Sequence, residues 1–260
     1  MNMSFYTGAV GAAQFTKKLS VTANNLANIN TRGYKPKTAA FSQLVEYNLN
    51  DSQGANTDLQ AGAGVCLSRT STDFGISGTV QTGGEYDYAI MEPNAFFMVQ
   101  DPETEQITYT RDGHFHSGER DDGFYLTTAS GKLVLDQYQE PLKLEVTDVE
   151  KLQEEMEEGY EEEDEEIEEF DEDAPRVGVY TFQNPSRLLS LGDNEYMTQN
   201  GMEPILREKP LLEKGALETS GTDMAKEMTK VIECQRAFSY ALKMVTTSDE
   251  IEATINSLRG

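Results

Sequence analysis

Two patterns of regularly spaced residues, one at each end of the 260-residue chain, most constrain what it can fold into. Near the N-terminus, small and apolar residues recur at alternating steps of four and three: Phe5, Ala9, Ala12, Thr16, Leu19, Ala23 and Leu26. Near the C-terminus, the same steps join Met224, Met228, Val231, Gln235, Phe238, Leu242 and Val245. This spacing forms one stripe along an α-helix, as in a coiled coil. We predict a helix at each end, and the alanines let a partner helix approach the first one closely.

Local signals set the ends of both helices. The first stripe stops at residues 28–33, where Asn30 and Gly33 suit the left-handed conformation that ends helices, and Pro36 prevents an immediate restart. The second helix is predicted to begin at Thr222 or Asp223, either of which can act as N-cap, and to run almost to residue 260. Its stripe changes phase before Ile251, Ile255 and Leu258.

The middle of the chain has a different pattern. Residues 62–147 contain short runs rich in Gly, Thr, Tyr, Phe and Val, separated by turn pairs such as those at 83–84, 112–113 and 130–131, and residues 176–206 resume it. The predicted fold is therefore mixed α+β, with terminal helices and a central all-β domain of short strands. The predicted boundaries are 1–35 for the first helix and its motif, 36–61 for a linker, 62–147 and 175–219 for the β-domain, 148–174 for an acidic insertion, and 220–260 for the last helix.

The net charge of −25 is unevenly distributed. Residues 150–173 hold sixteen Asp and Glu and one Lys. They contain too few apolar side chains to offset the conformational entropy that ordering would cost. We therefore predict a disordered insertion, with a short helix over 148–158 as an alternative. Such an acidic chain is repelled by nucleic-acid phosphates. No apolar run approaches the ~20 residues that span a bilayer, and we expect no cleavable leader.

The sequence offers little that points to catalysis. His114 and His116 share one face of a predicted strand, and Asp112 or Glu119 would have to complete a metal site, for which nothing fixes the geometry. Cys66 and Cys234 lie far apart in the sequence, which favours two free thiols. Phosphate-loop and nucleophile-elbow motifs are missing. We predict no enzyme, no cofactor, no metal and no small-molecule substrate.

Six sequence stretches, taken in order, resemble the bacterial flagellar axial proteins of the rod and hook. They are ANNLANINTRGYK at 23–35, FSQL at 41–44, YTRDG at 109–113 followed by Phe115, FQNP at 182–185, GALETS at 215–220, and EM at 227–228 with Ile232 and QRAF at 235–238. The resemblance spans nearly the whole chain. It departs at 91–97, where MEPNAFF replaces an EGxGFF strand, at 220–223, where SGTD replaces SNVD, and in the acidic insertion.

The resemblance implies that the terminal helices pair as a coiled coil and that the segment after the first helix packs between subunits. Taken alone, the asparagine pattern favours capping of the helix end. With the resemblance, we expect Asn24, Asn25 and Asn28 to bond to neighbouring subunits and Asn30 to cap. The predicted assembly residues are Asn24, Asn25, Leu26, Asn28, Asn30, Thr31, Gly33, Tyr34, Met228, Ile232, Gln235, Arg236, Phe238 and Leu242.

The function implied by the resemblance is a structural subunit of the basal-body rod, most similar to the distal-rod type or its close relative. The expected partners are further copies of the chain, other rod and hook proteins and the flagellar export apparatus. Two alternatives remain: a hook or hook-like subunit, and an adhesive or carbohydrate-binding β-domain carried by oligomerising helices. The second rests on Tyr86, Tyr88 and Tyr125.

Overall fold

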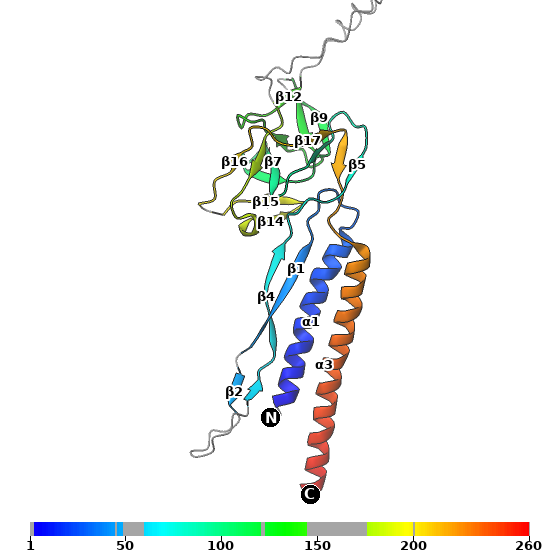
Figure 1. The fold of residues 1–260 in the computed structure, drawn as a ribbon. Helices are drawn as coiled ribbons and strands as arrows, with labels where there is room; N and C mark the ends of the chain where they lie inside the picture. The colour runs from blue at the N-terminus through cyan, green and yellow to red at the C-terminus, as the bar shows by residue number, and fades with distance from the viewer. Residues whose placement is uncertain are drawn as a thin grey trace, which may run out of the picture. The chain divides into compact units, whose positions relative to one another are not determined.

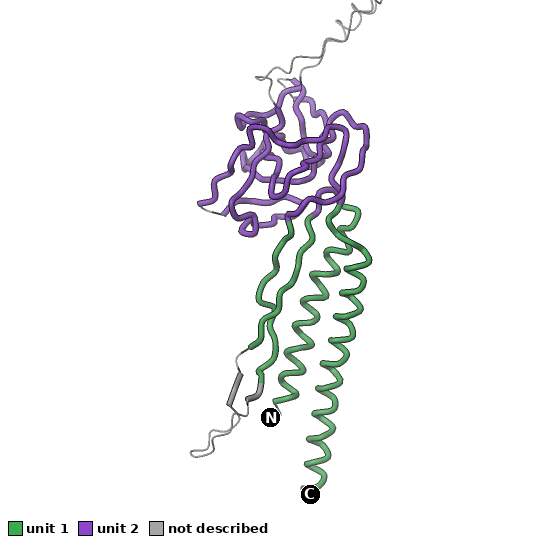
Figure 2. The backbone as a smooth tube through the Cα atoms, viewed as in Figure 1, with its two compact units in different colours: residues 1–31, 35–73, 220–260 green, residues 32–34, 74–219 purple. Residues whose placement is uncertain are grey.

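The computed structural model describes residues 3–44, 46–48, 60–120, 123–144, 176–199 and 201–259. Two compact units emerge, each assembled from separate parts of the sequence (Figure 2). Unit 1 comprises residues 1–31, 35–73 and 220–260, and unit 2 comprises residues 32–34 and 74–219. The predicted acidic insertion at 148–174 lies outside the described residues.

Unit 1 contains two long helices and a pair of long strands (Figure 1). The helices are α1 (Met3–Ala27) and α3 (Met224–Arg259), and they contact each other. Strands β1 (Lys37–Gln43) and β4 (Val65–Thr72) form an antiparallel pair that also contacts α1, and β2 (Glu46–Asn48) pairs with β3 (Gln60–Gly62). The predicted helices and β-rich middle are both present.

The structure differs from the predicted boundaries between residues 36 and 72. The segment predicted as a linker contains β1 and β2, and β4 belongs to unit 1 rather than to the central β-domain. The physical reason is packing on α1: Phe41 of β1 lies edge-on to Phe15, with ring centroids 5.6 Å apart. Such cross-element packing favours a strand that local turn signals alone do not reveal.

The face of α1 that packs inward is shifted by one residue from the predicted stripe. The helix buries Gly8, Gly11, Ala12, Thr22 and Asn25, whereas Phe5 is 42% exposed. A Cβ at position 8 would lie 3.0 Å from Val245 Cγ2 and 3.1 Å from the Ala241 carbonyl oxygen, so glycine permits this approach. The predicted stripe was based on the spacing of apolar side chains, and glycines in a helix contact do not contribute to that spacing.

On α3, three of the seven residues of the predicted stripe face α1 and four are exposed. Val231, Phe238 and Val245 are partly buried, but Met228 and Leu242 are 51% and 44% exposed. Their expected places are taken by the buried residues Glu227, Cys234 and Ser248 together with the partly buried Ala241. The face of α3 nearest α1 is therefore made of small and polar residues, and several large apolar side chains remain outside it.

Unit 2 is organised around one antiparallel sheet whose strands differ in length. Its main path runs β12-β10-β11-β7-β8-β15-β14, with β9, β13 and β16 attached. These strands are β7 (Ala95–Gln100), β8 (Ile107–Thr110), β9 (Phe115–Arg120), β10 (Gly123–Thr128), β11 (Leu133–Val134), β12 (Lys143–Leu144), β13 (Val179–Thr181), β14 (Leu189–Gly192), β15 (Glu195–Met197) and β16 (Ile205–Leu206). Strands β5 (Thr79–Gln81) and β6 (Tyr88–Ile90) pair with β18 (Ala216–Glu218) and β17 (Leu212–Lys214) respectively, and η1 spans Pro185–Arg187.

Strand β7 lies at the centre of unit 2. Its continuous apolar run is typical of a strand buried on both faces, and every residue but Gln100 is buried. Because side chains alternate along a strand, Phe97 and Val99 enter one hydrophobic cluster, and Phe96 and Met98 enter another. Residues 95–97, which belong to the segment that departs from the family pattern, thus still lie in the central strand.

In the part of the chain that the structure describes, neither helix is long and apolar enough to cross a membrane.

Candidate assembly site

The asparagine run at the end of α1 divides into buried and exposed members. Asn24 and Asn30 are exposed. Asn28 is partly buried and makes local bonds: its Nδ2 donates to the Asn24 carbonyl at 2.8 Å, and its Oδ1 accepts from Thr31 Oγ1 at 3.2 Å. Asn28 therefore closes the helix end, a role predicted for Asn30. Asn30 is not among the described residues with a positive φ, whereas Gly33 is, at +63°.

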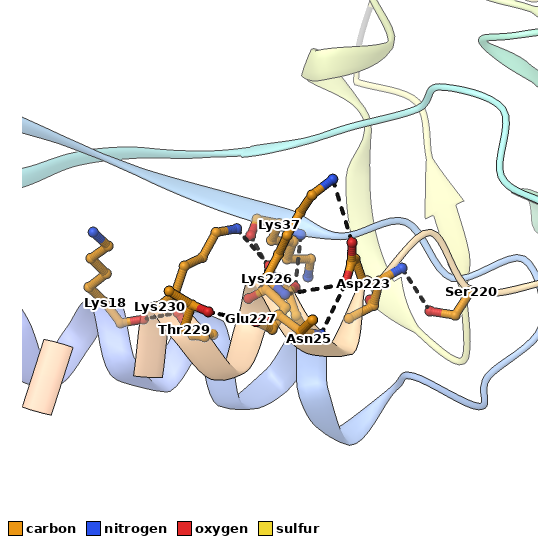
Figure 3. Close-up of polar contacts among 12 residues, drawn as sticks. Lys18, Asn25, Lys37, Ser220, Asp223, Lys226, Glu227, Thr229 and Lys230 are labelled. Atoms are coloured by element: carbon orange, nitrogen blue, oxygen red, sulfur yellow. Dashed lines mark hydrogen bonds and ion pairs between the residues drawn. The ribbon is translucent and has the colours of Figure 1, made fainter. Parts of the chain in front are cut away.

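Asn25 lies inside unit 1, with 1% of its surface exposed. Its Oδ1 accepts from the Lys37 backbone N–H at 2.9 Å, and its Nδ2 donates to the Lys37 carbonyl at 2.8 Å (Figure 3). The same Nδ2 lies 3.3 Å from Glu227 Oε2. One amide thus joins the end of α1 to the first residues of β1 and α3. This placement leaves the amide directed into the subunit, not toward a neighbour.

The first turn of α3 completes this cluster (Figure 3). Glu227 is 4% exposed and accepts from Lys230 Nζ at 2.6 Å. Asp223 is the N-cap, because its Oδ1 accepts from the backbone N–H of Ala225 at 2.9 Å and of Lys226 at 3.2 Å. The bond from the Lys226 backbone is the main cause that lowers the pKa of Asp223 below its usual value. Of the two predicted caps, the structure selects Asp223.

Gly33 and Tyr34, predicted to lie between subunits, are buried within unit 2. The Gly33 N–H donates to the Glu218 carbonyl at 2.9 Å. A Cβ on Gly33 would lie 2.6 Å from the Arg111 carbonyl oxygen, which no side chain tolerates. Tyr34 is 6% exposed. These residues therefore shape the fold of unit 2.

Sequence reasoning missed the buried ion pair beside Gly33. The side chains of Arg111 and Glu218 are 0% and 1% exposed, and Arg111 Nε donates to Glu218 Oε2 at 2.8 Å. The remaining guanidinium N–H groups donate to Glu218 Oε1 and to backbone carbonyls of residues 90, 92 and 95. Both residues lie in stretches that resemble the family, but spacing gives no signal for a pair 107 positions apart.

Most of the predicted residues of α3 lie on its surface. Met228 and Ile232 are 51% and 50% exposed, Leu242 is 44% exposed, and Gln235 and Arg236 are exposed. Phe238 is partly buried and, with Phe15, Leu19 and Cys234, lines a groove between the two helices. We call Met224, Met228, Ile232, Gln235 and Leu242 the methionine face of α3. Leu26 and Thr31, the remaining predicted residues, are partly buried.

Of the candidate metal residues, His114 is bonded within unit 2 to a carboxylate that was not among the candidates. His114 Nδ1 lies 2.7 Å from Asp87 Oδ1, and Thr82 donates to Asp87 Oδ2. Burial raises the pKa of Asp87, but hydrogen bonds from Thr82 and His114 and the charge of His114 outweigh it, so the pKa is lowered overall. Within the described ranges, no three His, Cys, Asp or Glu residues are grouped so that they could hold a metal.

Both cysteines are free, as predicted. Cys66 is partly exposed, and its Sγ lies 3.1 Å from Ser42 Oγ. Cys234 is buried on the α1-facing side of α3, and burial raises the pKa of its thiol. The Cys234 side chain therefore acts as a small apolar group in the helix contact.

Comparisons with known proteins cover both ends of the chain and its whole length. Residues 5–35 match the model of the flagella basal body rod protein family, and residues 213–258 match that of the flagellar basal body rod FlgEFG protein C-terminal region. The flagellar basal-body rod protein FlgG of Buchnera aphidicola subsp. Schizaphis graminum is 30% identical, with 92% of this chain and 93% of the relative covered. This chain belongs to the flagellar basal-body rod protein family.

Further relatives cover this rod protein completely. FlgG of Bacillus subtilis is 29% identical, with 100% of both chains covered. The flagellar hook-basal body complex protein FlhP of the same organism is 26% identical, again with 100% of both covered. These likenesses place the rod protein in the FlgG/FlgF type and assign it a structural role in the flagellar basal body. They favour neither the hook subunit nor the carbohydrate-binding alternative.

Proposed function

We propose that this rod protein polymerises through unit 1 into the tubular axial shaft of the basal body. The observation that carries the proposal is the methionine face of α3, which lies outside the contact with α1. Large exposed apolar side chains that recur on one helix face are typical of a surface that another protein covers. Methionine is flexible and polarisable, so such a face adapts to slightly different neighbours.

The two helices are proposed to act as one coiled-coil unit in the polymer. On α3, the positions nearest α1 follow alternating steps of four and three through residues 227, 231, 234, 238, 241, 245 and 248. The facing positions on α1 are small or polar, and Ser4 Oγ lies 3.1 Å from Ser248 Oγ. The spacing supports a heptad seam, and the small residues support a close approach of the helices.

The asparagines are proposed to have different roles. Asn25 acts inside the subunit, because both ends of its amide are already bonded to Lys37. Asn24, Asn28 and Asn30 remain candidates for bonds to a neighbouring subunit, with Asn28 also closing α1. An amide suits this role because it offers a donor and an acceptor without a charge to desolvate.

Further copies of the chain, other rod and hook proteins and the flagellar export apparatus are the proposed partners. The acidic insertion is proposed to keep exported monomers soluble or to face the structures around the rod. Residues 1–35 and 220–260 are proposed as the assembly segments, and residues 62–147 and 175–219 as the outer β-domain, apart from β4.

The test is a charge placed on the methionine face. Met228→Glu is expected to leave the monomer folded, since residue 228 is half exposed, but to prevent recovery of the chain in purified basal bodies. Thr229→Glu, at an exposed polar position beside that face, is the matched control and is expected to assemble. Normal recovery of the Met228→Glu chain would remove this face from the assembly contact.

A further inference from the structure

An apolar groove opens on unit 1 beside the contact of α1 with α3. It has a volume of about 660 Å³ and is lined from three directions: by Gly8 and Gly11 of α1, by Ala241 and Met244 of α3, and by Val65, the first residue of β4, with the preceding Gly64. Every residue that lines it is uncharged. Its walls include small residues, so the groove is open enough to accept large side chains from outside.

The same chain carries an apolar ridge that no described part of unit 1 covers. Beyond Ser248, every residue of α3 from 249 to 259 is exposed, and Figure 1 shows this red end of α3 extending past the start of α1. Ile251, Ile255 and Leu258 are 50%, 54% and 83% exposed. Steps of four and three put them on one side of the helix, and we call them the C-terminal ridge.

The ridge and the groove match in length. Seven residues of helix separate Ile251 from Leu258, which corresponds to about 10 Å at 1.5 Å per residue. The groove is lined by α3 from Ala237 to Met244, which is the same helical length. The phase change noted in the sequence thus moves the apolar residues of α3 from the methionine face to the side that carries the groove.

The charges around the two surfaces are also complementary. α1 carries Lys17 and Lys18 and no acidic residue, and α3 from 234 to 247 carries Arg236 and Lys243 and no acidic residue. The segment 249–259 carries three acidic residues and one arginine. In a chain of net charge −25, this separation favours contact between the end of one α3 and the groove of another copy.

We propose that the C-terminal ridge of one subunit docks in the groove of a second copy, so that neighbouring subunits join head to tail. This inference rests on the proposed polymerisation and names the surfaces that carry one of its contacts. Each subunit offers a ridge to one neighbour and a groove to another. Such a heterologous contact extends indefinitely, unlike a symmetric dimer contact, as a rod requires.

Disulfide trapping in purified basal bodies tests this contact. Met244→Cys is combined in turn with Ile251→Cys, Ile255→Cys or Leu258→Cys, in a background of Cys66→Ser and Cys234→Ala. The paired positions lie about 10 to 21 Å apart along one helix, too far for a disulfide within a chain, whose Cα atoms must lie within about 7 Å. Any bond formed therefore joins two separate chains.

The expected result is a ladder of linked chains on a non-reducing gel for at least one pair. Met244→Cys with Ala253→Cys is the control, because residue 253 is exposed on the opposite side of α3, and it should give no ladder. Basal bodies that contain all variants but yield no ladder would overturn the docking while leaving the polymerisation intact. An equal ladder from the control, or a bond to a different flagellar protein, would also overturn it.

Two further outcomes separate this inference from the proposed function. Absence of the unmodified chain from basal bodies would contradict the polymerisation itself. If only the cysteine variants are missing, the same oxidation is applied to the purified folded chains in solution. A ladder there supports the docking, and no ladder at concentrations where the unmodified chain associates would overturn it.

Discussion

At the residue scale, Gly33 shows how little freedom some positions have. Its φ of +63° disfavours any residue with a Cβ, and the Arg111 carbonyl oxygen occupies the space that a Cβ needs. We predict that Gly33→Ala lowers the free energy of unfolding of unit 2 by more than about 3 kcal/mol, since strain and a clash combine. Gly131→Ala is the control, at φ +83° with nothing within 4 Å, and should cost about 1–2 kcal/mol from the backbone conformation alone. If urea denaturation gives the same loss of unfolding free energy for both variants, the predicted clash with the Arg111 carbonyl oxygen does not destabilise unit 2.

Arg111 provides the second residue-scale prediction. Arg111→Met would leave the Glu218 carboxylate buried without a positive charge beside it, and we expect a loss of about 3–5 kcal/mol in the free energy of unfolding. The control is Arg207→Met, because Arg207 is 54% exposed where it pairs with Glu92, and an exposed pair contributes at most about 1 kcal/mol. Thermal and urea unfolding followed by tyrosine fluorescence measure both. A loss at Arg111 no larger than at Arg207 would contradict the assigned burial.

At the element scale, Asn25 determines how α1, β1 and α3 meet. We predict that Asn25→Leu costs at least about 2 kcal/mol, because the partly buried Lys37 N–H and carbonyl groups and the buried Glu227 carboxylate would all lose a hydrogen bond. Asn30→Leu alters an exposed asparagine three residues past α1 and should change stability by less than about 0.5 kcal/mol. Urea denaturation followed by far-ultraviolet circular dichroism reports on both helices. Similar values for the two variants would show that Asn25 does not hold the elements together.

The elements were largely predictable, but their contacts were not. Periodicity and capping signals place α3 within a residue or two of its observed bounds, and β7 is evident from its apolar run. The stripe predicted on α1 is one residue away from the face that contacts α3. The reason is that Gly8 and Gly11 let the helices approach closely, and glycine does not contribute to an apolar pattern. The burial of Glu227 was not predicted either, because a carboxylate is expected at the surface unless its bonding partners are known.

At the scale of the whole molecule, sequence order does not follow spatial order. Unit 1 takes residues from both ends and from 35–73, and unit 2 takes residues 32–34, which include Gly33 and Tyr34, from near the end of the N-terminal motif. A single sequence read from end to end indicates strands and turns but not which strand pairs with which, so β1 and β4 could not be assigned to the helical unit. The Arg111–Glu218 pair depends on the same long-range folding.

The central claim is that this chain is an axial subunit of the basal-body rod. The most direct test is mass spectrometry of basal bodies purified from the source bacterium, compared with a strain that lacks the flagellar export apparatus. We expect the chain to be recovered in the rod fraction of the first strain and to be missing from the strain that lacks the export apparatus. Intact basal bodies without the chain would contradict the account, and the exposed faces of α3 would then have to serve another assembly.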